Sequence, residues 1–559
     1  MTSPVETLNA FPITVNEDQT FPVLTDAQLA RISQHGHGRK AKAGEVLYDI
    51  GAPVRHFYAV VSGAIEAVQL RDSGGVRVRT IRSGQFSGEV SILSGRPSLV
   101  TLRVCQDGEI VELDRQSLLN VIQTDAELSE ILVRAFLLRR VGLISGGFAD
   151  VVLVGSNHSS DTLRIKEFLT RNAHPYTSID PDHDPHIQEL LDQFRFSLSD
   201  LPVLICRNTA VLRNPTNNEI ADCLGFNDSI DQTQTRDVVI VGAGPAGLAA
   251  AVYAASEGLD VLVIESTSPG GQAGSSSRIE NYLGFPAGIT GQELTGRAYT
   301  QAQKFGADVA IAETVVNLNC TPKAYKVRLD NDVEVHARTI VIATGAQYRK
   351  LPLSNLDQFE GVGIYYGATF IESQLCEDDE VIVVGGGNSA GQAAVFLAQT
   401  ARRVHMLVRS RGLAETMSRY LIRRIEESSR ITLHTCTEIV ALDGDDHLER
   451  VQWRTDGQDA ESQAIRHVFL MTGATPTTKW LDGCVTLDAQ GFVKTGPDLT
   501  TDDLAAAKWP LARQPHLLET SRPGVFAVGD VRAGNVKRVA SAVGEGSIAI
   551  SFVHRALQE

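Results

Sequence analysis

The sequence predicts a multidomain α/β protein with a small all-β roll, a small α/β unit and two larger units built on parallel sheets. Three observations predict this fold class. The chain has 559 residues, which gives room for about three to five domains of ~100 to 200 residues each. Its first part has short apolar strands separated by glycine turns, and its second half contains one strand, glycine loop and helix pattern twice.

Composition and charge exclude several classes of protein. The formal charge is −16, from 51 Lys and Arg against 67 Asp and Glu, so the phosphate backbone of a nucleic acid would be repelled on balance. No segment has the ~18 uninterrupted apolar residues of a membrane helix, and the first residues lack a signal-peptide pattern. We therefore expect a cytoplasmic protein that binds neither nucleic acid nor membranes.

The seven cysteines are scattered along the chain, and none of them forms a Cys-x-x-Cys pair. This spacing excludes a zinc ribbon, a disulfide framework and a local dithiol. We expect no metal site.

The first two domains are predicted from their strand and helix patterns. After a tail over 1–19, residues 20–145 contain the glycine-punctuated strands of the roll and then a helix from about Asp125 to Ile144 with apolar residues at spacings of three and four. Residues 150–226 alternate strands with helices over 161–172, 185–194 and 217–226, which predicts a small α/β unit. A polar linker over 227–236 follows.

The first glycine-rich loop has the form Gly242-x-Gly244-x-x-Gly247, after an apolar strand and before an alanine-rich helix. The first glycine permits the turn, the second lets backbone approach a pyrophosphate, and the third lets the helix pack on the strand. Glu265 ends the next strand, where an acid accepts hydrogen bonds from ribose hydroxyls. Together these features predict a dinucleotide-binding site.

The second loop is Gly385-x-Gly387-x-x-Ala390, and Arg409 ends the strand that follows its helix, with Arg411 nearby. A guanidinium pairs with a 2′-phosphate that a carboxylate would repel. This pattern favours NADPH. NADH is the alternative if both arginines are only solvated surface charges.

These two loops, together with PGGQ at 269–272, ATG at 343–345 and GVFAVGD at 524–530, resemble the low-molecular-weight thioredoxin reductases over about residues 236–559. The resemblance implies an FAD-binding domain in two pieces, 237–353 and 477–559, around an NAD(P)H-binding domain over 354–476. It also implies a homodimer that transfers hydride from NADPH to FAD.

The same resemblance assigns cofactor contacts residue by residue. For FAD they are Gly242, Gly244, Pro245, Ala246, Gly247, Glu265, Gly271, Gln272, Asn281, Thr344, Gly345, Gly529, Asp530, Arg538, Val539 and Ala540. For NADPH they are Gly385, Gly387, Asn388, Ser389, Ala390, Arg409 and Arg411. Val539 stands where relatives often have glutamine.

One departure from the reductase pattern concerns its chemistry. Thioredoxin reductases carry a Cys-Ala-Thr-Cys pair shortly before the second glycine loop, and Tyr365 and Ala368 stand at the two cysteine positions here. Disulfide exchange needs a thiolate to attack sulfur and a second thiol to resolve the mixed disulfide. We therefore expect the usual exit for electrons to be missing.

The two N-terminal domains show similar departures. Residues 150–226 resemble the glutaredoxin and thioredoxin fold, with Pro202 at the position of its cis-proline, but Ser159 and Thr162 replace the redox cysteines. Residues 20–145 resemble the cyclic nucleotide-binding roll, with FSGEVSIL at 86–93 as its phosphate-binding cassette. By this likeness Gly88 and Glu89 hold the ligand. Ser98 stands where the family has its phosphate-binding arginine, and the candidate substitutes are Arg96 and Arg103.

Two functional hypotheses follow. In the first, the chain is an oxidoreductase that passes hydride from NADPH to FAD and electrons on to an unidentified acceptor, such as a small redox protein, oxygen or a quinone-like molecule. A ligand of the N-terminal roll, a cyclic nucleotide by resemblance, would regulate it through the long helix and the domain rotation that the family uses to alternate flavin access. In the alternative, the chain is a redox- or nucleotide-sensing flavoprotein that signals or docks with little turnover.

Overall fold

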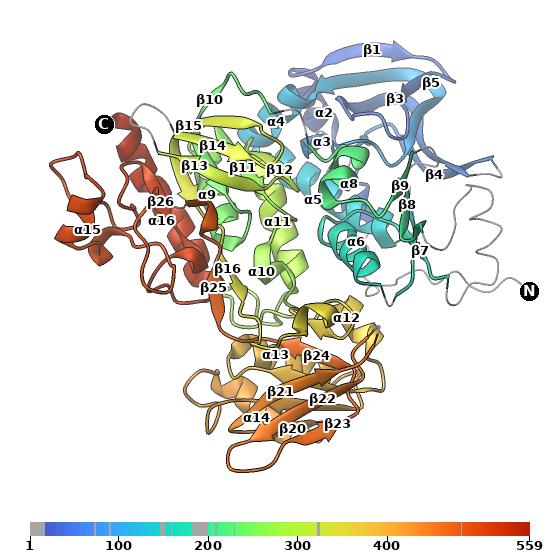
Figure 1. Cartoon of the computed structure of the whole chain (residues 1–559). Coiled ribbons are helices and arrows are strands. Elements are labelled where there is room, and N and C mark those ends of the chain that lie inside the picture. Colours follow the sequence, from blue (N-terminus) through green and yellow to red (C-terminus); the bar gives the residue numbers. More distant parts are fainter. Residues whose placement is uncertain are drawn as a thin grey trace, which may run out of the picture. The chain divides into compact units, whose positions relative to one another are not determined.

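The computed structural model of the chain describes residues 17–71, 74–88, 91–94, 96–145, 151–157, 159–181, 200–206, 210–227, 230–320, 325–445, 447–481 and 483–559. Figure 1 labels its helices and strands. The chain divides into two compact units. Unit 1 contains Met1–Gly155, Asn172–Ile230 and Thr300–Ala312, and unit 2 contains Ser156–Arg171, Asp231–Tyr299 and Glu313–Glu559.

Unit 1 begins with the predicted roll. Strand β5 (Thr101–Asp114) pairs with most of the others, in an antiparallel sheet of order β1-β5-β3-β4 with β2 also on β5. The remaining elements are α1 (Glu17–Thr20), α2 (Asp26–Ser33), β1 (His37–Ala41), β2 (Val46–Tyr48), β3 (His56–Arg71), β4 (Gly74–Arg82), α3 (Ser91–Ser94), α4 (Arg115–Thr124) and α5 (Ala126–Ser145). The all-β roll and the long helix after it are confirmed.

Helix α5 closes the core of the roll because its apolar face carries Phe136. This ring is fully buried and packs edge-on against Phe57 and Phe86, at centroid distances of 6.3 and 6.1 Å. Leu128 and Leu132 of the same helix are buried in the same cluster. The three- and four-residue spacing predicted from the sequence therefore describes the face that packs on the roll.

The second part of unit 1 is a four-stranded sheet of order β7-β6-β8-β9. Strand β6 (Val151–Val154) is parallel to β7 (Thr177–Ile179) and antiparallel to β8 (Val203–Cys206), which pairs with β9 (Ala210–Arg213). The Leu201–Pro202 peptide bond is cis, as predicted. Helix α8 (Asn217–Leu224) follows β9, and β12 (Asp308–Ile311) also falls in unit 1. The predicted helix over 185–194 lies outside the described residues.

Unit 2 contains the two parallel-sheet domains. In the first, β10 (Thr235–Val241) lies between β11 (Val261–Glu265) and β15 (Glu334–Ile342), and β15 also pairs with β26 (Val525–Ala527), all in parallel. The antiparallel strands β14 (Tyr325–Leu329) and β13 (Val315–Asn319) extend the sheet. The helices are α9 (Pro245–Ser256), α10 (Gly271–Gly274), α11 (Gly291–Lys304), α15 (Thr501–Ala506) and α16 (Val539–Gln558), with 3-10 turns η3 (Lys479–Leu481), η4 (Gly496–Asp498) and η5 (Gly529–Val531).

The second domain of unit 2 has a parallel sheet of order β17-β24-β18-β19-β20. Its strands are β17 (Ile364–Tyr365), β18 (Glu380–Val384), β19 (Arg403–Leu407), β20 (Ile431–His434) and β24 (His467–Leu470). Its helices are α12 (Phe370–Leu375), α13 (Asn388–Leu397) and α14 (Arg419–Glu427), with turn η2 (Leu356–Phe359) and a small antiparallel sheet of β21 (Thr437–Asp443), β22 (Arg450–Thr455) and β23 (Glu461–Gln463). The crossing strands β16 (Ala346–Tyr348) and β25 (Ala474–Pro476) pair with each other and join it to the first domain.

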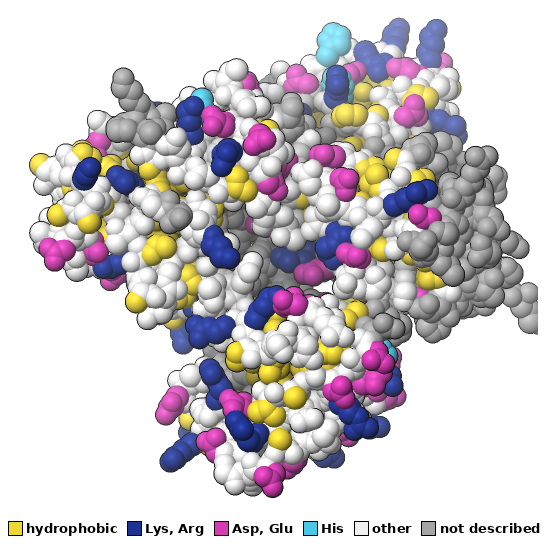
Figure 2. Space-filling model, in the orientation of Figure 1, with side chains coloured by type: hydrophobic (Ala, Val, Ile, Leu, Met, Phe, Trp, Pro, Cys, Tyr) yellow, Lys and Arg dark blue, Asp and Glu magenta, His cyan; other side chains and the backbone are white. Residues whose placement is uncertain are grey.

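The surface carries both signs of charge. In Figure 2, Lys and Arg side chains are interspersed with Asp and Glu side chains over the visible face. Within the described part of the chain, no helix combines the length and apolar character needed to cross a bilayer.

Candidate active site

The first glycine loop lies where four parallel strands end. Val241 of β10 is in register with Ile264 and Ile342 of its two neighbours, and Ile342 is in register with Ala527 of β26. The carboxyl ends of parallel strands share one edge of a sheet, which is the usual site for ligands. Four predicted segments therefore meet at this edge: the loop after β10, Glu265, Thr344 with Gly345, and Gly529 with Asp530.

The glycines of this loop are required by close packing. Gly242 has a φ of +103°, and a Cβ there would lie 2.4 Å from the carbonyl oxygen of Ala343. A Cβ on Gly247 would lie 1.8 Å from the carbonyl oxygen of Gly242. Gly244 caps helix α9, with Pro245 in its first turn. The loop thus presents backbone and the positive end of a 12-residue helix, which is the arrangement that binds a pyrophosphate.

Glu265 is held by the loop itself. Its carboxylate is 8% exposed and accepts hydrogen bonds from the backbone N–H groups of Ala243, Thr267 and Ser268, at 2.7, 2.9 and 3.3 Å. Burial raises the pKa of Glu265, and the hydrogen bonds together with the charge of Arg171 oppose that rise. A carboxylate has about four acceptor positions, so it retains capacity for a ribose hydroxyl.

The remaining predicted FAD contacts follow on neighbouring loops. Gln272 of α10 donates to the carbonyl oxygen of Ala346, and Thr344 donates to that of Thr477 at 2.8 Å. Burial raises the pKa of Asp530, with Lys537 opposing and Glu545 adding to the rise. Asn281 is exposed on the loop between α10 and α11. The other three predicted residues lie at the start of α16: Arg538, Val539 and Ala540.

The structure offers two further signs that this edge fits FAD. The hydroxyl of Ser268 is fully buried beside Glu265 and has no hydrogen-bond partner among the described residues. A Cβ on Gly271 would lie 3.1 Å from the Cα of Gly244, so two glycines keep side-chain atoms out of the loop. FAD supplies two-electron chemistry when bound, and these residues would bind and orient it.

The second glycine loop repeats the strand, turn and helix arrangement in the other domain of unit 2. Gly385 has a φ of +140°, and a Cβ there would lie 2.3 Å from the carbonyl oxygen of Met471. Gly387 caps helix α13 and has open space around its Cα. Ala390 is fully buried against Gly385, which explains why alanine fits at the third position.

Around this loop, two predicted NADPH-binding side chains form hydrogen bonds within the protein, and two are exposed to solvent. Asn388 accepts a hydrogen bond from the backbone N–H of Ser418 at 2.8 Å. Burial raises the pKa of Tyr348 in strand β16, whereas a hydrogen bond with Ser389 opposes the rise. Arg409 and Arg411 are both exposed beyond the end of β19, and their contact with a 2′-phosphate stays a prediction.

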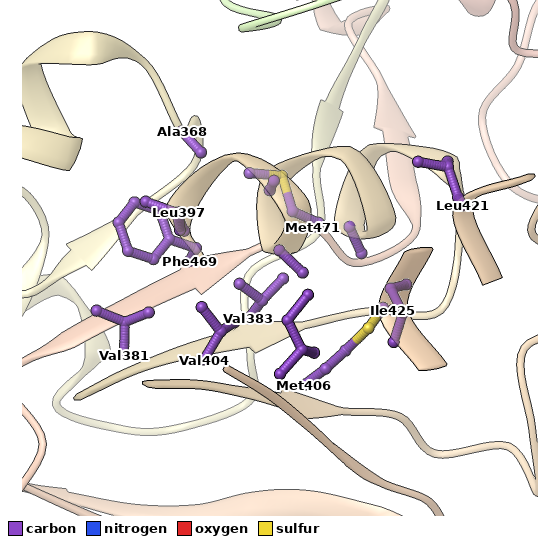
Figure 3. Close-up of a cluster of buried hydrophobic side chains, with 14 of the residues drawn as sticks. Ala368, Val381, Val383, Leu397, Val404, Met406, Leu421, Ile425, Phe469 and Met471 are labelled. Atoms are coloured by element: carbon purple, nitrogen blue, oxygen red, sulfur yellow. The ribbon is translucent and has the colours of Figure 1, made fainter. Parts of the chain in front are cut away.

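The two positions of the missing cysteine pair are part of a packed core. Tyr365 is 8% and Ala368 5% exposed, and both belong to the buried cluster between the sheet and α13 that Figure 3 shows around Leu397 and Phe469. The Tyr365 ring stacks on His467 and contacts Phe469, at centroid distances of 5.9 and 5.3 Å. Apolar side chains therefore pack around both positions.

Cys376 lies in the same cluster and cannot replace the missing pair. It is fully buried, and its thiol donates to the carbonyl oxygen of Ser373 at 3.6 Å. Burial, with smaller contributions from Asp379 and Glu372, raises the pKa of Cys376 to about 12. A neutral thiol is a poor nucleophile.

Two other cysteines meet in space, which the sequence reasoning did not find. Cys320, after β13, forms a disulfide with Cys484, after η3, with a Cα–Cα distance of 5.9 Å across 164 residues of sequence. No local spacing predicts this pair because the fold alone brings the two segments together.

In the segment predicted as a small α/β unit, the positions of the redox cysteines also lack thiols, and the structure groups these positions with unit 2. Ser159 precedes helix α6 (Ser160–Arg171), and its hydroxyl accepts a hydrogen bond from the backbone N–H of Thr162 at 3.4 Å. Thr162 is fully buried. Cys206 is also buried, as expected for a packing residue.

In the roll, the structure describes part of the predicted ligand site. Gly88 has a φ of +97°, and Arg139 of α5 donates to its carbonyl oxygen at 2.8 Å and to that of Phe86 at 3.0 Å. Arg96 is 8% exposed, donates to the carbonyl oxygen of Asn172 at 3.3 Å and lies 4.3 Å above the Phe226 ring. Glu89 lies outside the described residues.

Arg103, the other candidate for binding the phosphate, pairs with Glu66 at 2.7 Å. Ser98 is buried, and its hydroxyl donates to the carbonyl oxygen of Val100 at 2.7 Å. Arg139 could not be predicted as part of this site, because the contacts of an arginine on a helix depend on how the helix packs.

This fold and these two loops define a flavin-dependent pyridine nucleotide oxidoreductase. A family model described as pyridine nucleotide-disulphide oxidoreductase matches residues 236–546. The chain belongs to this family. A model for the cyclic nucleotide-binding domain matches residues 38–125, in agreement with the roll.

Within this family the chain is similar to thioredoxin reductases. Those of Mycolicibacterium smegmatis and Bacillus subtilis (strain 168) are 33% and 30% identical over 333 and 324 residues, which cover 59% and 58% of this chain and 99% and 95% of those proteins. The crystal structure of Lactococcus lactis thioredoxin reductase in the FR conformation matches with a TM-score of 0.52 and 27% identity, over 58% of this chain and 99% of that one. The chain is an NADPH-dependent flavin oxidoreductase with FAD and NADPH as cofactors.

Proposed function

We propose that this oxidoreductase passes electrons from its flavin directly to an acceptor, without a cysteine relay in the NADPH-binding domain. The observation that carries the proposal is the packing of Tyr365 and Ala368. Both are buried in an apolar cluster, where family resemblance places the redox pair. Both nucleotide-binding loops keep the glycines that their turns require.

The remaining thiols support the same proposal. Cys376 is neutral at physiological pH because burial raises its pKa to about 12. Cys320 and Cys484 are tied in a disulfide outside the predicted NADPH-binding domain. The acceptor is then a small redox protein, oxygen or a quinone-like molecule that reaches the flavin itself.

Contacts between the Gly88 turn of the roll and helix α5 support regulation by a ligand of the roll. Arg139 and Phe136 of α5 both touch the Gly88 turn: Arg139 donates to its carbonyl oxygen, and a Cβ on Gly88 would lie 3.2 Å from the Phe136 ring. A ligand that moves this turn would therefore move α5. A cyclic nucleotide is the candidate, with Gly88, Glu89 and Arg96 as its predicted contacts. Calorimetric titration with cyclic AMP and cyclic GMP tests this, and absence of heat at millimolar ligand would contradict it.

We also propose an oligomeric state and a cellular location for the protein. Likeness to the reductases favours a cytoplasmic homodimer. Light scattering after size-exclusion chromatography checks the dimer, and a mass of 60.4 kDa would mean a monomer instead.

Steady-state NADPH oxidation with a panel of acceptors tests the central proposal. Wild type is compared with a variant that lacks all seven cysteines and with one that keeps only Cys320 and Cys484. We expect equal turnover in wild type and the variant that keeps this pair. Loss of turnover in that variant would contradict the proposal. Flavin that NADPH cannot reduce in wild type would instead favour the alternative, a sensing or docking flavoprotein.

A further inference from the structure

Helix α6 packs on the reductase domains of unit 2, although it follows a strand of the small α/β unit in sequence. The side-chain amide of Gln292 in α11 donates to the carbonyl oxygen of Thr170 at 2.7 Å. Leu163 packs against the buried cluster of the NADPH-binding domain. A Cβ on Gly361 would lie 2.8 Å from that of Ser160. The last residue of the helix, Arg171, lies at the FAD-binding loops.

Arg171 is fixed beside the residues that would hold FAD. Its guanidinium donates to the carbonyl oxygen of Gly271 at 2.8 Å and pairs with Glu167, one helical turn earlier, at 3.2 Å. The side chain is 17% exposed. Its positive charge lowers the pKa of Glu265 against the effect of burial, which places the charge within electrostatic reach of the acid that closes the first glycine loop.

One donor of this guanidinium has no acceptor. The Nε–H of Arg171 is buried and has no hydrogen-bond partner in the described part of the chain. Buried donors are normally paired, since an unpaired one loses its hydrogen bonds to water without replacement. A planar guanidinium with a free N–H matches the oxygens of a phosphate.

The neighbouring backbone leads from Arg171 to the expected diphosphate position. Gly271, whose carbonyl holds the guanidinium, has its Cα close to Gly244, which caps helix α9. The N-terminus of α9 is the binding position for a pyrophosphate in this fold. An acceptor on the bound nucleotide would therefore come next to the unpaired donor.

We propose that Arg171 is an FAD-binding residue that neutralises the cofactor's diphosphate, so that helix α6 completes the FAD site of the reductase. This inference rests on FAD as cofactor and is independent of the electron acceptor. Helix α6 then has a role that does not depend on redox cysteines. Its C-terminal end supplies positive charge to the flavin nucleotide, although the start of the helix has no cysteine.

The test measures FAD affinity of the full-length chain after flavin removal, by quenching of flavin fluorescence. Arg171→Gln should weaken FAD binding by about 10-fold or more, as expected for loss of a charge-assisted hydrogen bond, and Arg171→Lys should restore part of it. Arg297→Gln is the matched control, because Arg297 also pairs with a glutamate four residues earlier but is 56% exposed. The control should bind FAD like wild type.

Competition with ADP and with adenosine separates a phosphate contact from a structural effect. Arg171→Gln should weaken ADP as a competitor and leave adenosine unchanged. Equal FAD affinity in Arg171→Gln and wild type would overturn the inference, as would equal weakening of ADP and adenosine. Absence of FAD binding in wild type would instead contradict the cofactor assignment.

Discussion

The nucleotide-binding loops and the position of the missing cysteine pair lie in one unit but differ in packing. Around Gly244 and Gly387, glycines keep side-chain atoms away from the helix N-termini. Around Tyr365 and Ala368, aromatic and aliphatic side chains fill the space. This difference supports the proposal that NADPH still delivers hydride to the flavin, while electrons leave the flavin without a sulfur relay in the NADPH-binding domain.

The largest effect is expected from a substitution in the first glycine loop. Gly247→Ala places a Cβ 1.8 Å from the carbonyl oxygen of Gly242, so the loop must shift. We expect the purified variant to contain no FAD and to show no NADPH oxidation. The flavin absorbance of the purified protein is the measurement. Gly142→Ala, in helix α5 with open space around its Cα, is the control and should retain flavin.

The next largest effect is expected on the stability of the protein when the buried Tyr365 is replaced. Tyr365→Ala removes a buried ring that packs on His467 and Phe469, and should lower the free energy of unfolding by about 3 kcal/mol, as for other large-to-small core changes. Urea denaturation measures it. Tyr253→Ala removes a ring that is 45% exposed and should cost far less. Equal losses in the two variants would mean that Tyr365 is not a packing residue.

A smaller effect is expected on the preference of the enzyme for NADPH over NADH. Arg409→Ala combined with Arg411→Ala should raise the KM for NADPH by about 10-fold, since a charge-assisted pair with the 2′-phosphate is lost, and should leave the KM for NADH unchanged. Arg402→Ala is the control, because Arg402 immediately precedes β19 and so lies at the opposite end of that strand from Arg409. If both KM values rise together, these arginines do not read the 2′-phosphate.

The smallest effect is expected at Cys376. Because burial raises its pKa to about 12, the thiol is neutral in the folded protein, and its stabilising contribution is present below the ordinary thiol pKa and lost as pH rises toward 12. At pH 8, iodoacetamide should alkylate the exposed Cys105 much faster than Cys376, as peptide mass spectrometry would show. Cys376→Ala should change NADPH oxidation less than about twofold. Rapid labelling of Cys376 would reveal an accessible thiolate.

The sequence allows prediction of those parts of the site that depend on local geometry. Gly242 and Gly385 follow strands, adopt positive φ and precede helices, and these requirements are visible within ten residues of sequence. The short strands of the roll and the long helix α5 were also predictable, from glycine-punctuated apolar runs and from apolar spacing.

Other parts could not be predicted because they depend on distant segments. Cys320 and Cys484 are 164 residues apart, and Arg171 contacts Gly271 across 100 residues. Arg96, which stays a predicted ligand contact of the roll, also finds its partners far along the chain, because it donates to Asn172 and lies over the Phe226 ring. A lone charged or sulfur-containing side chain has no periodicity, so its partner becomes known only when the chain has folded.

Anaerobic titration with NADPH, followed by flavin absorbance, tests the central claim most directly. A flavin accepts two electrons from one hydride donor, and a disulfide in electronic contact with it would accept two more as it is reduced to a dithiol. We expect one equivalent of NADPH to bleach the flavin fully in wild type and in the Cys376→Ala variant. Consumption of two equivalents per flavin in wild type would show a redox-active disulfide in the electron path and would exclude direct electron transfer from the flavin to the acceptor.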